Sequence, residues 1–265
     1  MKELLNRMAV PCRDDGRKFT DDARLKAIAC ELVGTQWRVW RSDSLCRIYA
    51  REGFDPMKPT LVFSSHVDMV AQRCYADCQG DVWRGSFDNL ITNAALVWDM
   101  REDLFGPQVL VAFTGDEEED SHGADQVARI LKGHGIPVQF IIATDVTEEG
   151  WNEEKSFTIE NILPDEGQDV ADALCWMLPL VLDLDPAPKV IVEGEADEAW
   201  EYDEFDFPCC SVCLPCHGEM HSERGVVVRA ESVAKFAVVL DRLGKLVVGS
   251  SKKIGGCSSR IYVTS

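Results

Sequence analysis

The chain has 265 residues, of which 46 are acidic and 27 basic, so its formal net charge at pH 7 is -19. A negative field of this size repels phosphate backbones and anionic lipid headgroups, and it argues against nucleic acid or membrane partners. The length fits one α/β domain with a modest insertion, and a hydrophobic content of 46% is enough for a substantial core.

The sequence also bears on the compartment. Its first residues contain no long apolar run of the kind that an export signal needs, and no stretch approaches the roughly 20 apolar residues of a membrane span. The chain has 11 cysteines, an odd number. Without an export signal we expect a cytoplasmic protein with reduced thiols, several of which fill the core.

Strand and helix patterns alternate along the chain. A helical pattern over 20–33, with Thr20 and Asp21 as candidate caps, precedes short strands at 36–40 and 45–49. Further apolar strands are predicted at 60–64, 108–113, 138–143, 156–160 and 189–192, and further helices at 88–100, 124–131, 169–177 and 232–243. This alternation predicts an α/β fold with a mixed, mostly parallel central sheet covered by helices on both faces.

Polar side chains directly follow three of the apolar strands. His66, the acidic run 116–120 and Asp145 occupy these positions. Ligand sites in such sheets lie beyond the carboxyl ends of the strands, so we expect these side chains to lie together. Asp68 stands two residues after His66, on the same side of an extended segment, where its carboxylate can orient the imidazole.

Two more polar residues stand next to helices. Asp88 lies where the helix at 88–100 begins, and His221 shortly precedes the last helix. Histidine nitrogens mixed with carboxylates suit zinc, or cobalt and manganese, better than calcium, which prefers oxygen ligands alone. Two metal ions about 3.5–4 Å apart that share a carboxylate can generate hydroxide at neutral pH, and a further carboxylate can act as base.

The motifs resemble those of a known clan. In order along 61–243 they are His66-x-Asp68, Phe87-Asp88-Asn89, Glu117-Glu118 followed by Gly123-Ala124, Asp145-Val146-Thr147, and His221-Ser222. This order resembles the co-catalytic two-zinc exopeptidases, which include leucyl, glutamyl and tetrahedral aminopeptidases, carboxypeptidase G and acetylornithine deacetylase. The resemblance implies a zinc-exopeptidase-like fold that binds two zinc ions, with cobalt or manganese as alternatives.

The resemblance assigns a ligand role to five residues. It implies that Asp88 bridges the two ions, that His66 and Asp145 complete one ion, and that Glu118 and His221 complete the other. It also implies a cis peptide bond directly after Asp88.

The same resemblance implies two catalytic carboxylates and a reaction. Glu117 matches the general base, and Asp68 matches the residue that orients the first histidine. The implied activity is two-metal-dependent hydrolysis of a peptide or amide bond, with an aminopeptidase favoured. Metal-bound hydroxide attacks the carbonyl of a small peptide or acylated amino acid, and Glu117 passes the proton to the leaving amine.

The spacing of the motifs limits the domain organisation. The stretch between His66 and Asp88 is too short for an inserted barrel, and the one between Asp145 and His221 is too short for a large lid. We therefore expect residues 1–265 to form one catalytic domain without a separate dimerisation or lid domain. The formation of a homo-oligomer is possible and stays an open question.

Two other functions use the same motifs. An N-acyl amino acid deacylase or carboxypeptidase would need an exposed arginine near the metals to hold a carboxylate, whereas an acidic mouth that binds an ammonium group favours an aminopeptidase. A non-catalytic metal-binding protein on the same fold is the second alternative, although such a protein has no need of a base beside a ligand.

Three details of the assignment stay open. A shift of one residue in the acidic run would select Glu118 and Glu119, and His217 is a rival to His221. Residues 120–122 are polar where the clan has a small or apolar stretch, and His122 within them can approach the site.

Two segments admit readings outside this assignment. Residues 213–217 match the CxxCH pattern of haem attachment, and the nearby thiols could also form a zinc ribbon or a redox pair, but we favour thiols on a strand before His221. The acidic segment 193–206 is predicted to be a solvated loop, although its interleaved aromatic residues indicate that it packs on another part of the protein.

Overall fold

The computed structural model describes residues 1–10, 22–71, 73–163, 170–185 and 187–245. The predicted caps Thr20 and Asp21 lie outside these residues. Helix α2 (Ala23–Glu31) is capped by Asp22, whose Oδ1 accepts hydrogen bonds from the backbone N–H of Arg24 at 2.6 Å and of Leu25 at 3.2 Å.

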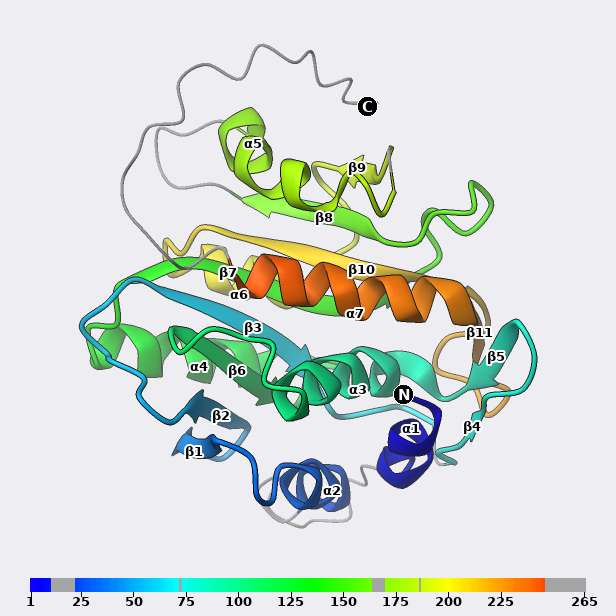
Figure 1. Ribbon diagram of the computed structural model, residues 1–265, viewed down its shortest axis with the longest axis horizontal. Helices are drawn as coiled ribbons and strands as arrows, with labels where there is room; N and C mark the ends of the chain where they lie inside the picture. Colours follow the sequence, from blue (N-terminus) through cyan, green and yellow to red (C-terminus); the bar gives the residue numbers. More distant parts are fainter. Residues whose placement is uncertain (11–21, 72, 164–169, 186, 246–265) are drawn as a thin grey trace.

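A mixed sheet forms the centre of the molecule (Figure 1). Strands β6, β3, β7 and β10 are parallel neighbours, β1 and β2 extend the sheet antiparallel on one side, and β8 pairs antiparallel with β10 on the other. In spatial order the strands are β1 (Trp37–Ser42), β2 (Cys46–Arg51), β6 (Val109–Thr114), β3 (Thr60–His66), β7 (Val138–Thr147), β10 (Cys209–Gly218), β8 (Thr158–Leu163) and β9 (Lys189–Ile191). The predicted mixed α/β sheet is confirmed.

A small antiparallel sheet continues from the end of β10. There β10 pairs with β11 (Val226–Arg229), which pairs with β5 (Val82–Gly85), and β5 pairs with β4 (Ala76–Asp77). The sequence did not predict β4, β5 or β11, because they are short and alternate between buried and exposed residues over few positions. This sheet matters for the site, since β5 leads into Asp88 and the β10–β11 turn contains His221.

Helices cover both faces of the central sheet, and α7 crosses in front of β10 in Figure 1. Consecutive residues of β3 point to opposite faces of the sheet: Phe63 packs into one apolar cluster and Val62 into the other. The first cluster lies under α1 (Lys2–Met8), α2, α3 (Phe87–Arg101), α5 (Val170–Val181) and α7 (Ala230–Gly244), and the second under α4 (His122–Gly133) and α6 (Glu198–Asp203). The sequence did not predict the short helices α1 and α6.

The cysteines on β10 are core residues. Cys213 and Cys216 are three positions apart on a strand, so their side chains point to opposite faces, and both are buried with Cys209 and Cys210. Burial raises the pKa of each of these thiols. This arrangement does not suit haem attachment, a zinc ribbon or a redox pair, and it supports thiols that line a strand.

Helix α3 contains a carboxyl group that predicts a pH effect on stability. Asp99 is 1% exposed and neither carboxylate oxygen has a hydrogen-bond partner among the described residues. Burial, aided by the nearby Asp241 and opposed by Lys245, raises the pKa of Asp99 to about 9. The folded protein therefore holds a proton that the unfolded chain loses above about pH 4, and this group makes stability fall as the pH rises from about 4 to 9.

We expect Asp99→Asn to remove this dependence. The free energy of unfolding of the variant should exceed that of the wild type by about 1 kcal/mol or more at pH 8, and the difference should shrink toward pH 5. Denaturant unfolding of both proteins at pH 5, 6.5 and 8 measures this, with the exposed Asp77→Asn as control. A difference that does not change with pH would contradict the assignment.

Candidate metal centre

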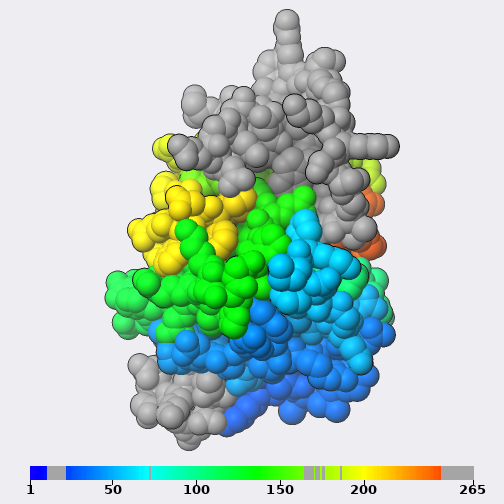
Figure 2. Space-filling view, turned by 90° about the vertical axis from the view of Figure 1, so that its left-hand side faces the viewer, coloured from blue at the N-terminus to red at the C-terminus, as the bar shows by residue number. Residues whose placement is uncertain are grey.

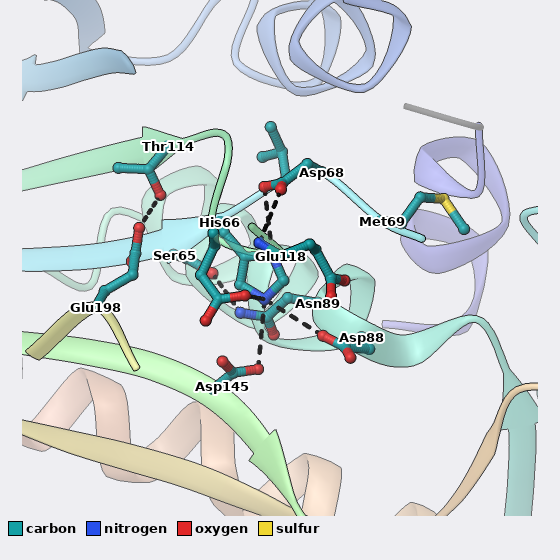
Figure 3. A network of polar contacts seen from close by, with 12 residues as sticks. Ser65, His66, Asp68, Met69, Asp88, Asn89, Thr114, Glu118, Asp145 and Glu198 are labelled. Atoms are coloured by element: carbon teal, nitrogen blue, oxygen red, sulfur yellow. Dashed lines mark hydrogen bonds and ion pairs between the residues drawn. The ribbon is translucent and has the colours of Figure 1, made fainter. Parts of the chain in front are cut away.

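His66 lies at the centre of the site, at the carboxyl end of β3 (Figure 3). Its side chain is 1% exposed. Nε2 lies 3.3 Å from Oδ1 of Asp88, 3.5 Å from Oδ1 of Asp145 and 3.7 Å from Oε2 of Glu117. Because β3 is parallel to β6 and β7, the residues that follow these strands meet at one edge of the sheet, as predicted.

Asp68 lies on the other side of the imidazole. Its Oδ1 is 3.5 Å from Nδ1 of His66, and its Oδ2 accepts a hydrogen bond from the backbone N–H of Glu118 at 3.2 Å. Burial opposes the charged carboxylate, but the attraction of the nearby His66 outweighs it and holds the pKa of Asp68 below its ordinary value. One carboxylate thus links the first histidine to the acidic run.

His221 faces the second oxygen of Asp88. Its Nε2 lies 3.2 Å from Oδ2 of Asp88 and 3.0 Å from Oε2 of Glu118. The rival His217 instead stacks on Trp151, with ring centroids 5.8 Å apart. The geometry therefore favours His221, and it places Asp88 between the two imidazoles.

The two histidines lie near different residues of the acidic run. Glu117 faces His66 and Glu118 faces His221, whereas Glu119 is exposed. Gly123 allows the chain after the acidic run to pass close to Gly115, because a Cβ at residue 123 would collide with the carbonyl oxygen of Gly115. The geometry thus favours the Glu117/Glu118 register over a shift by one residue.

His122 points away from the centre. Its Nδ1 pairs with Oδ2 of Asp116, its side chain is 59% exposed, and it is not among the described residues that line the cleft. The hydrogen bond to Asp116 raises the pKa of His122. The polar residues 120–122 therefore lie outside the immediate site.

Two buried asparagines on α3 hold the strand ends together. Nδ2 of Asn89 donates to the carbonyl of Thr144 at 2.6 Å, and Nδ2 of Asn93 donates to the carbonyl of His66 at 2.7 Å. These bonds fix β3 and β7 at the positions from which His66 and Asp145 project. Asn89 belongs to one of the sequence motifs, whereas Asn93, one helical turn later, belongs to none. The Asp88–Asn89 peptide bond is cis, as predicted.

Glu198 is a buried residue next to the site that no sequence motif predicted. It is 3% exposed, accepts a hydrogen bond from Oγ of Ser64 at 2.8 Å, and also accepts one from Oγ1 of Thr114 (Figure 3). Burial raises the pKa of Glu198 to about 8. Because Ser64 is on β3 and Thr114 ends β6, Glu198 links the strands that lead to His66 and to the acidic run.

The prediction that 193–206 is a solvated loop is therefore wrong for its second half. Tyr202 on α6 is fully buried and shares a 2.7 Å hydrogen bond with Ser64. The guanidinium of Arg129 on α4 lies 5.2 Å from the ring centroid of Phe205. Figure 2 shows the yellow segment around residue 200 lying against the green surface of α4. The interleaved aromatic residues were the signal that this segment packs.

The side chains present fit divalent cations. Nε2 of His66 and Oε1 of Glu118 are buried and have no hydrogen-bond partner among the described residues, and the ligand atoms of His66, Asp88 and Glu118 lie within 4.8 Å of one another. Burial, together with the negative charge of neighbouring carboxylates, raises the pKa of Asp145 to about 7 and of Glu118 to about 8, and a cation bound there would offset both effects. Nitrogen and oxygen donors in this ratio suit zinc, cobalt or manganese.

A cleft of about 580 Å³ opens from this centre. Ten of its lining residues are acidic, including Asp88, Glu117, Glu118 and Asp145. Within the described part of the chain, neither lysine nor arginine lines it. The cleft is thus large enough for a small substrate, and its charge favours a cationic one.

None of the described helices is both long enough and apolar enough to cross a bilayer.

The sequence matches no family model and no curated protein. The fold, in contrast, is found in solved structures. A TET aminopeptidase from a marine sediment archaeon of the Thaumarchaeota has a TM-score of 0.70 at 12% identity, over 92% of this chain and 96% of that one. An aminopeptidase from Desulfurococcus kamchatkensis has a TM-score of 0.67 at 11% identity, over 95% and 98%. The Pyrococcus horikoshii TET1 peptidase, which can assemble into a tetrahedron or a large octahedral shell, has a TM-score of 0.58 at 12% identity, over 83% and 92%. This chain therefore has the fold of these aminopeptidases.

Proposed function

We propose that this protein is a metal-dependent aminopeptidase. The observation that carries the proposal is the placement of His66 and His221 on the two oxygens of Asp88, at one end of an acidic cleft. The shared fold of solved aminopeptidases supports the same function.

Five residues would hold two metal ions. His66 and Asp145 would bind one, Glu118 and His221 the other, and Asp88 both. Zinc is the proposed metal, with cobalt or manganese as alternatives. When bound, such ions polarise a carbonyl group and lower the pKa of water.

Glu117 is the proposed general base. Its carboxylate faces the centre, and burial raises its pKa, so that it can accept a proton from the attacking water and return it to the leaving amine. Asp68 keeps the imidazole of His66 oriented. The net negative charge of the cleft as a whole favours a substrate with a cationic N-terminus.

The two alternative functions have less support. A deacylase or carboxypeptidase needs a cationic side chain for the substrate carboxylate, and none of the described residues in the cleft supplies it. A non-catalytic metal-binding protein gains nothing from Glu117 beside the ligands. The assignment of 1–265 to one catalytic domain, homo-oligomer assembly and a cytoplasmic location stay predictions.

A substrate panel tests the proposal. Aminoacyl anilides, free dipeptides, N-acyl amino acids and N-blocked peptides are assayed with zinc, cobalt or manganese, and after chelation. We expect hydrolysis of substrates with a free α-amino group, loss of hydrolysis on chelation and recovery on metal addition. Hydrolysis confined to N-acyl amino acids would select the deacylase, and inactivity with no bound metal would overturn the proposal.

A further inference from the structure

The acidic side chains of the cleft form two groups. One group surrounds the proposed metal centre. The other, the distal acidic wall, lies on β8 and on the segments after β7 and β9, and consists of Glu148, Glu149, Glu160, Glu193, Glu195 and Asp197. The proposed peptidase reaction does not use the distal acidic wall.

Glu160 is the central residue of the distal acidic wall. It lines the cleft but is only 6% exposed, and its Oε1 accepts a hydrogen bond from Oγ1 of Thr158 at 2.5 Å. A carboxylate this buried carries a desolvation cost that a cation in the cleft would offset.

The sheet sets the distance between Glu160 and the centre. Asp145 on β7 pairs with Cys213 on β10, and Ser211, two residues before Cys213, pairs with Glu160 on β8. Adjacent strands are about 4.8 Å apart and successive residues about 3.3 Å apart, so the backbone of Glu160 lies two strands across and two residues along the sheet from that of Asp145, at about 12 Å. A substrate whose carbonyl lies at the centre can reach Glu160 only with a long side chain.

Among the described residues, one member of the distal acidic wall has an ion pair: Glu149 pairs with Lys189, which also pairs with Glu153 at 3.1 Å. The other five members of the wall have no ion pair with a described lysine or arginine. At the other end of the same cleft, Oε1 of Glu118 is buried and unpartnered among the described residues. The cleft thus joins the proposed metal centre to a second group of carboxylates, five of which have no ion pair among the described residues.

We propose that the distal acidic wall is a subsite for the cationic side chain of a substrate, with Glu160 as the residue that selects lysine or arginine at its N-terminus. This rests on the proposed aminopeptidase function. The α-amino group and the scissile carbonyl would lie at the metal centre, and the side-chain ammonium or guanidinium would lie against Glu160. A buried carboxylate distinguishes such a group from a neutral isostere, since only the cation compensates its charge.

Isosteric substrate pairs test this proposal. Lysyl and norleucyl anilides have side chains of similar length, as do arginyl and citrullyl anilides, and each pair differs in charge. We expect kcat/KM for the cationic member to be about tenfold or more higher. Glu160→Gln should lower this ratio to near one, whereas Glu52→Gln, an equal charge change at an exposed position outside the cleft, should leave it unchanged.

Binding without turnover gives a second readout. Calorimetry should show that arginine binds more tightly than citrulline to the wild type, and that Glu160→Gln removes the difference. If Glu160→Gln does not fold, the exposed pair Glu193→Gln and Glu195→Gln is tested instead, with a smaller expected loss of the ratio.

The outcomes separate the subsite from the function. If neutral and cationic substrates are cleaved equally well, or if Glu160→Gln leaves the ratio unchanged, the subsite is overturned and the aminopeptidase stands. If no substrate with a free α-amino group is cleaved, the function has failed. Preferential binding of arginine over citrulline would then still support the subsite, and equal binding would overturn it.

Discussion

Replacing Glu117 by alanine is expected to lower kcat by about 10²–10⁴-fold while the protein still binds its metal ions. The carboxylate lies 3.7 Å from Nε2 of His66, but other residues complete both proposed ligand sets. Its removal therefore takes away the group that moves the proton and leaves the centre in place. Steady-state kinetics together with elemental analysis of metal content measures the two effects separately.

Glu119→Ala is the matched control for this prediction. Glu119 belongs to the same acidic run but is exposed and does not line the cleft within the described chain. Its removal should leave kcat within a fewfold of the wild type. If Glu119→Ala abolished turnover and Glu117→Ala did not, the register of the run would be shifted by one residue and the assignment of the base would be wrong.

The second large effect is expected at Asp88. Its two oxygens face His66 at 3.3 Å and His221 at 3.2 Å, so the proposed ligand sets share this one carboxylate. We expect Asp88→Asn to reduce metal content from about two ions to one or fewer, because an amide has one oxygen donor and no negative charge. Activity should fall by about 10³-fold or more, and excess metal should restore it only partly.

Asp81→Asn makes the same charge change at an exposed position before β5 and should keep the metal content and activity of the wild type. Metal content is measured after equilibrium dialysis, and circular dichroism checks that both variants are folded. Full occupancy of both sites in Asp88→Asn would show that Asp88 does not bridge them. Unchanged activity with full occupancy would remove Asp88 from the mechanism altogether.

Glu198 and Asn93 show why a ligand set alone does not define this site. Asn93 holds the carbonyl of His66, and Glu198 links Ser64 to Thr114 beneath the ligands. Both act through hydrogen bonds that fix where the strands end, and a displacement of those ends would move the ligands. Such supporting contacts carry no pattern in a sequence, because their partners lie far apart along the chain.

Sequence alone predicted the parts of this protein that depend on local order. The strand that ends at His66 can be predicted from sequence because residues 61–63 at its centre are apolar, as in a buried strand, and parallel strands present their carboxyl ends at one edge. The resemblance in motif order also predicted the cis bond after Asp88, which the structure contains. The roles that it gives to Glu117, Glu118 and His221 stay predictions, and the distances among these side chains favour them.

The features of this protein that depend on long-range packing became visible only in the tertiary structure. The small sheet that contains the approach to Asp88 is built of strands too short to show a period, and α6 lies in a segment whose charge suggested solvent. Glu198 and Tyr202 are buried and form hydrogen bonds with residues of β3 and β6. These partners lie far away along the chain, so the sequence does not reveal the contacts. The distal acidic wall arises in the same way, since β10 brings β8 beside β7 and places Glu160 within reach of the metal centre.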